Sequence, residues 1–98
     1  MPEIALTPSL RRKLAALFSS EDQAFAERWL TTECGEDIPG GAPSPEALER
    51  IRAAALKVSA GSLERLARAT KLARSDWRDI LMAAGFGDLE AHKVWLSD

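Results

Sequence analysis

The sequence has little of the chemistry on which most enzymes and metal sites depend. Its 98 residues include one cysteine, one histidine and no tyrosine. A single cysteine can form neither an internal disulfide nor a zinc site, so we expect a reducing compartment. The chain also lacks metal-ligand spacings and a glycine-rich phosphate loop. These absences predict a protein that is not an enzyme and that holds no cofactor and no metal.

Two side chains could still support catalysis, and both have simpler explanations. His92 shares a helical face with Leu89 and Leu96 near the C-terminus, which favours a packing role over that of a base. Cys34 has three carboxylates within three positions of it. Neighbouring negative charge disfavours the reactive thiolate, so we expect no catalytic cysteine.

Long apolar runs are absent as well. No stretch approaches the ~18 apolar residues of a membrane span. Basic residues interrupt the only early apolar stretch at positions 11–13, so we expect no signal peptide. The composition is 46% hydrophobic and 29% charged, with a formal net charge of −2, which is typical of one globular domain. We therefore predict a cytoplasmic protein without membrane association.

Helix is the only regular structure that the sequence favours. Alanine and leucine dominate, β-branched residues are sparse, and apolar residues recur at helical spacing. Helix caps or stops are expected at Thr7, Ser20, Ser44, the break from Ser59 to Ser62, Ser75 and Gly85. We predict an all-α fold, a compact bundle of five or six short helices. Residues 1–98 form a single domain with a Gly/Pro-rich loop at 35–45.

The second predicted helix carries two specific expectations. Phe25 and Trp29 stand one turn apart and, with Leu30, predict the buried side of the helix. Ser20 is the expected N-cap, and Gln23 stands three residues later, where it could complete a capping box. Both expectations depend only on local spacing.

Charge is distributed unevenly along the chain. Residues 19–49 carry a net charge of −7, whereas residues 50–78 carry +6. Such asymmetry occurs when two halves of one bundle attract each other, and also when one face binds a partner. The first explanation is the commoner one for a small helical domain.

The segment from Ser75 to Asp79 concentrates a tryptophan, an arginine and two aspartates. Ser75 is a candidate N-cap, and acids at Asp76 and Asp79 oppose the positive end of the helix dipole. Trp77 is in line with the apolar positions that follow it and predicts a core contact. The segment is therefore expected to form a corner between helices. Alternatively, Arg78 and Asp79 present a polar hot spot to a partner.

Part of the chain resembles small uncharacterised bacterial proteins, in which a leucine-lysine-leucine-serine segment precedes an aromatic-arginine-aspartate motif. The residues that match are Leu56, Lys57, Ser59, Gly61, Leu63, Leu66, Trp77, Arg78 and Asp79. Val58 replaces the usual leucine. The similarity covers residues 54–86, about a third of the chain. It implies a bacterial cytosolic protein with an all-helical unit, and it carries no assigned activity.

Nucleic-acid binding is the alternative function. Residues 63–81 can be aligned with a helix-turn-helix that has Leu72 in its turn. Four basic residues then form a ladder that could follow phosphates, namely Arg65, Arg68, Lys71 and Arg74. Against this, Lys71 replaces the turn glycine, and Asp76 and Asp79 open the second helix. We therefore expect nucleic-acid binding to be the weaker hypothesis.

We predict a small cytosolic protein–protein interaction module, such as an adaptor, a regulator or an immunity-type protein. Its partner is another protein or a second copy of the chain. The expected partner surface comprises Arg65, Arg68, Lys71, Arg74, Arg78 and Asp79.

Overall fold

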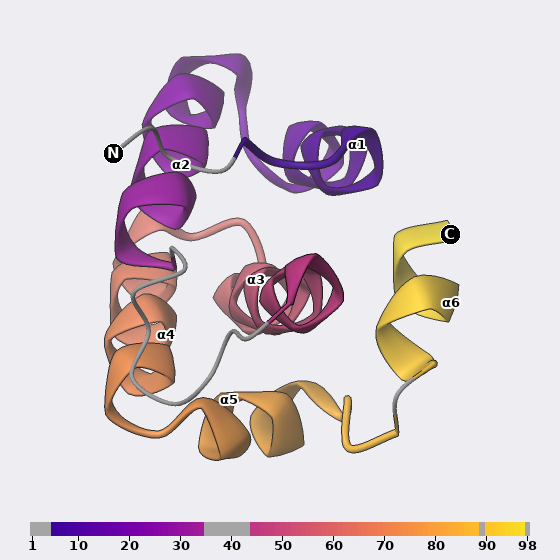
Figure 1. Ribbon diagram of the computed structural model, residues 1–98. Helices are drawn as coiled ribbons and strands as arrows, with labels where there is room; N and C mark the ends of the chain where they lie inside the picture. Colours follow the sequence, from indigo (N-terminus) through magenta and orange to yellow (C-terminus); the bar gives the residue numbers. More distant parts are fainter. Residues whose placement is uncertain (1–4, 35–43, 89, 98) are drawn as a thin grey trace.

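The computed structural model describes residues 5–34, 44–88 and 90–97. They form six helices: α1 (Pro8–Leu17), α2 (Ser20–Glu33), α3 (Pro45–Ser59), α4 (Leu63–Ser75), α5 (Trp77–Ala84) and α6 (Ala91–Ser97). These residues include no strand, so the predicted all-α bundle is confirmed (Figure 1). Most of the predicted loop at 35–45 lies outside the described residues. Its last two positions belong to α3, as the N-cap and the first helical residue.

Helix α3 lies at the centre of the bundle, and the other helices surround it (Figure 1). All six residues from Ile51 to Leu56 are buried. A helix with consecutive buried positions has neighbours on every side, and α3 packs against α1, α4, α5 and α6. The three alanines at 53–55 have no bulk beyond Cβ, which permits a close approach of the neighbouring helices.

Most predicted caps are present. The hydroxyl oxygens of Thr7, Ser44 and Ser62 each accept a hydrogen bond from the backbone N–H three residues later. Gly85 ends α5 in the left-handed conformation, with φ of 78°. These short-range contacts explain why the sequence could locate the helix ends.

Two predicted caps are wrong by one residue. Helix α2 has Ser19 as its N-cap, and the side chain of Gln23 forms no capping box. Its amide instead donates to the carbonyl oxygens of Ala15 and Phe18 at the end of α1, at 3.3 and 3.1 Å. Helix α5 is capped by Asp76, because Ser75 still belongs to the last turn of α4.

The predicted buried side of α2 is also partly wrong. Phe25 is 54% exposed, whereas Ala26, Leu30 and Thr31 are buried. Among the described residues, helix α2 packs mainly against α1 and α4, so its buried stripe is narrow and Phe25 falls outside it. Trp29 is half-buried and donates its indole N–H to the hydroxyl of Thr70 on α4, at 2.8 Å.

Arg52 is the largest side chain that lies fully in the interior, with 2% of its surface exposed. Its Nε donates to the carbonyl oxygen of Cys34 at 2.7 Å, and its Nη1 donates to that of Ala5 at 3.3 Å. A buried charge is tolerated only when it is hydrogen-bonded. Arg52 therefore holds the end of α2 and the segment before α1 against the central helix.

We expect Arg52→Met to destabilise the protein by about 2–5 kcal/mol, because the buried carbonyl of Cys34 and the part-buried carbonyl of Ala5 lose a charged donor. Arg50→Met is the matched control, since Arg50 donates to the carbonyls of Phe86 and Gly87 nearer the surface. Water can replace that donor, so we expect a cost of about 0.5–1.5 kcal/mol. Urea unfolding measures both, and equal losses would contradict the central role of Arg52.

The turn between α3 and α4 imposes a second constraint. Gly61 has φ of 83°, and a methyl group on it would overlap the carbonyl oxygen of Leu17. Gly85 has a similar φ of 78°, but its nearest neighbour would be Lys57 Nζ at 3.9 Å. The two glycines therefore separate backbone strain from steric overlap.

We expect Gly85→Ala to cost about 1–2 kcal/mol, the strain of a left-handed alanine. Gly61→Ala should cost about 1–3 kcal/mol more, because α1 must also move away from the turn. Chemical denaturation of the two variants checks this difference. A Gly61→Ala variant as stable as Gly85→Ala would show that the turn does not press on α1.

Candidate functional site

Five of the six predicted partner-surface side chains are exposed: Arg65, Arg68, Lys71, Arg78 and Asp79. The sixth, Arg74, is half-buried and donates to the carbonyl oxygen of Glu33 at the end of α2, at 3.2 Å. The predicted basic ladder does not form one surface. The four residues are spaced three apart, and each such step falls about 60° short of a full helical turn. Their side chains therefore extend half-way around α4.

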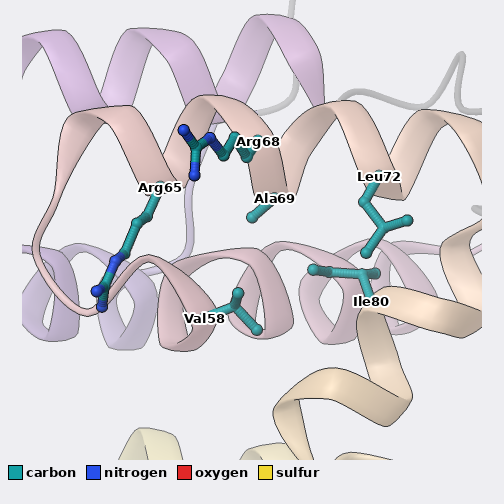
Figure 2. A pocket seen from close by; sticks show the side chains of 6 residues that line it. All are labelled: Val58, Arg65, Arg68, Ala69, Leu72 and Ile80. Carbon is teal, nitrogen blue, oxygen red and sulfur yellow. The ribbon is translucent and has the colours of Figure 1, made fainter.

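A groove accompanies the first part of the ladder. It has a volume of about 330 Å³ and lies where α3 and α5 meet α4 (Figure 2). This cavity is called the groove, and it is lined by Val58, Arg65, Arg68, Ala69, Leu72 and Ile80. Figure 2 shows Ala69 and Leu72 of α4 pointing toward Val58 of α3 and Ile80 of α5. The apolar floor of the groove is thus continuous with the hydrophobic core.

Arginine side chains border this apolar surface. Arg68 forms an exposed ion pair with Glu64 one turn earlier, at 2.7 Å. No carboxylate of the described residues pairs with Arg65, Lys71 or Arg78. Arg65 therefore offers the groove a positive charge that the rest of the described chain leaves unneutralised.

The sequence pattern does not indicate the groove. Its apolar members come from three helices, so no single periodic stripe of the sequence contains them all. Only the combination of half-buried Val58 and Leu72 with exposed arginines distinguishes the place from ordinary core. That combination depends on how the helices meet, which local spacing does not specify.

The proposed helix-turn-helix alignment is wrong. Leu72 lies inside α4, which continues to Ser75, and Asp76 is the single residue that separates α4 from α5. A helix-turn-helix connection takes three or four residues. The segment 63–81 thus consists of two helices joined at a single acidic residue. The Asp76 side chain caps α5 by accepting a hydrogen bond from the N–H of Arg78, at 3.1 Å.

The corner at Trp77 is mainly structural. Trp77 is half-buried and packs against the core, as the sequence predicts. The guanidinium carbon of Arg78 lies over the Trp77 ring, 5.3 Å from its centre, in a cation–π contact. Asp79 is exposed in the first turn of α5.

A second cavity of about 220 Å³ lies between the start of α3 and α6, and His92 lines it. His92 is 3% exposed, and its ring meets the Phe86 ring edge-on at 6.3 Å. Its buried Nδ1 has no hydrogen-bond partner among the described residues. The predicted packing role fits these contacts.

Burial lowers the pKa of His92, and the charges of Arg50 and Lys93 lower it further, whereas Glu49 and Glu90 oppose them. A pKa below the usual 6.5 means that the unfolded chain takes up the proton first on acidification. The fold is therefore favoured by the neutral form of His92, and this stabilisation is complete above about pH 6.5 and decreases as the pH drops below that value.

We expect the urea concentration at the unfolding midpoint to decrease as the pH is lowered from 7 toward the pKa of His92. The variant His92→Gln should show a smaller decrease. Unfolding at several pH values measures it. Carboxylates common to both proteins cancel in the difference. Parallel pH profiles for the two proteins would mean that His92 is not held neutral in the fold.

Neither a metal-ion cluster nor a membrane-spanning helix is found in the described part of the chain. No three of its histidine, cysteine, aspartate and glutamate side chains gather as a metal ion would require. Within 5–34, 44–88 and 90–97, no helix has both the length and the hydropathy to cross a bilayer. No known family model, curated protein or solved structure matches the chain. The similarity to small bacterial proteins remains a prediction.

Proposed function

We propose that the protein is a small protein–protein interaction module and that the groove receives an apolar side chain of the partner. The groove itself is the observation that carries this proposal. Protein interfaces combine an apolar centre with a polar rim and are enriched in arginine. Val58 and Leu72 supply half-buried apolar walls, and Arg65 and Arg68 supply the rim.

The same proposal includes the absence of catalysis and a bacterial cytosolic setting. Cys34 is buried in the core, and His92, which lines the second cavity, is only 3% exposed, so both side chains offer little surface to a substrate. The setting rests on the resemblance of residues 54–86 to bacterial proteins and on the single cysteine. Within this proposal, the module is an adaptor, a regulator or an immunity-type protein.

A tagged protein should retain a stoichiometric protein partner from its host's lysate after nuclease treatment. Arg65→Glu should remove that partner, because the unpaired positive charge on the rim of the groove would become negative. Lys71→Glu is the matched control: it makes the same charge change on an exposed position of the same helix, outside the groove lining. Affinity capture followed by mass spectrometry provides the measurement.

Two results would contradict the proposal. Equal loss with Arg65→Glu and Lys71→Glu would indicate a diffuse charge effect in place of a groove. Nucleic acid that is retained at low salt and removed at moderate salt would favour the alternative function, since phosphate binding depends steeply on salt.

A further inference from the structure

An aromatic projection stands on the outer face of α2. The ring of Phe25 is 54% exposed and stacks on Trp29, with ring centres 5.8 Å apart and planes at 14°. Trp29 is in turn fixed by its hydrogen bond to Thr70. The projection is therefore a supported aromatic group, which is the kind of side chain that anchors interfaces.

Carboxylates precede this projection on the same helix. Glu21 and Asp22 lie four and three residues before Phe25, so they are one turn away on its side of α2. Neither pairs with a cation of the described residues. The groove has the opposite charge, because Arg65 lacks a carboxylate partner there.

The spacing of the two surfaces also corresponds. Glu21 precedes Phe25 by four residues, and Arg65 precedes Ala69 by four, which is about 6 Å along each helix. If α2 lies parallel to α4 with Phe25 over Ala69, Glu21 comes opposite Arg65. Arg28 then comes opposite Leu72.

The groove has room for the ring. A cavity of about 150 Å³ is enough to bind benzene, and the groove measures about 330 Å³. Its apolar walls come from Val58, Leu72 and Ile80, so the ring would exchange water for aliphatic contacts.

We propose that the occupant of the groove is a second copy of this chain, which inserts Phe25 of its α2. This inference rests on the interaction function proposed above. Projection and groove belong to different parts of the molecule, so each copy offers both at once. Thr70 faces α2, whereas Leu72 and Arg65 face the groove at the other edge of α4. Such head-to-tail contacts produce open chains or rings, in contrast to a two-fold dimer.

Sedimentation velocity of the full chain over a range of concentration and salt tests this inference. We expect the wild type to form species that grow with concentration and shrink with salt, because exposed charges steer the contact. Phe25→Ser and the double variant Arg65→Glu/Arg68→Glu should each weaken association about tenfold or more, through loss of the anchor and through like-charge opposition. Circular dichroism would confirm that both remain folded.

Mixing the two variants is the decisive step. Phe25→Ser retains its groove and the arginine variant retains its projection, so an equimolar mixture should form one-to-one dimers that cannot grow. Lys71→Glu should assemble like the wild type. A monomeric wild type at every concentration, or a mixture that stays monomeric, would overturn the inference.

That failure can be told apart from failure of the proposed function. A monomeric protein whose captured partner is still lost with Arg65→Glu would keep the groove as an interface and remove only the second copy as its occupant. Assembly that is unaffected by Phe25→Ser would likewise overturn the insertion of Phe25, whatever the groove binds.

Discussion

The burial of Arg52 at the centre of α3 is the constraint on which the rest of the structure depends. A guanidinium group with 2% of its surface exposed must find acceptors inside the protein, and it finds the carbonyls of Cys34 and Ala5. These two groups belong to the end of α2 and to the segment before α1. One side chain thereby fixes two outer parts of the chain against the central helix. The position of α3 then decides where the remaining helices pack.

The uneven charge of the sequence has a structural use that differs from simple attraction between halves. Four basic side chains donate to backbone carbonyls near helix ends: Arg50 to Phe86, Arg52 to Cys34, Lys57 to Ala84 and Arg74 to Glu33. The last carbonyls of a helix carry partial negative charge and lack intrahelical partners, so cations stabilise them. Half of the basic side chains in residues 50–78 therefore donate hydrogen bonds to carbonyl groups at or near the C-terminal ends of α2 and α5. Arg65, Lys71 and Arg78 are exposed and have no carboxylate partner among the described residues, whereas Arg68 is exposed and pairs with Glu64.

Local chemistry made the helices predictable, because a cap or a stop needs only residues within one turn. The serine and threonine caps and Gly85 are of this kind. Burial was less predictable, since it depends on which neighbours a helix has. Phe25 has the right spacing for a core residue, but α2 has too few neighbours to cover it. Arg52 looks like a surface residue by type, yet α3 has neighbours on all sides. The groove unites Val58, Leu72 and Ile80 from three helices, so no local pattern could indicate it.

The joint between α4 and α5 links the structural and functional interpretations of the Trp77 corner. The N–H of Asp76 donates to the carbonyl of Leu72 at 2.7 Å, while its carboxylate accepts from the N–H of Arg78. One residue thus ends α4 and begins α5 without an intervening loop. Ile80 consequently lies one turn into α5, which places it beside Leu72 in the wall of the groove (Figure 2). A longer connection would let α5 shift along α4 and would separate these two side chains. The corner therefore serves the proposed interface by setting its shape, and its aspartates need not touch a partner to matter for binding.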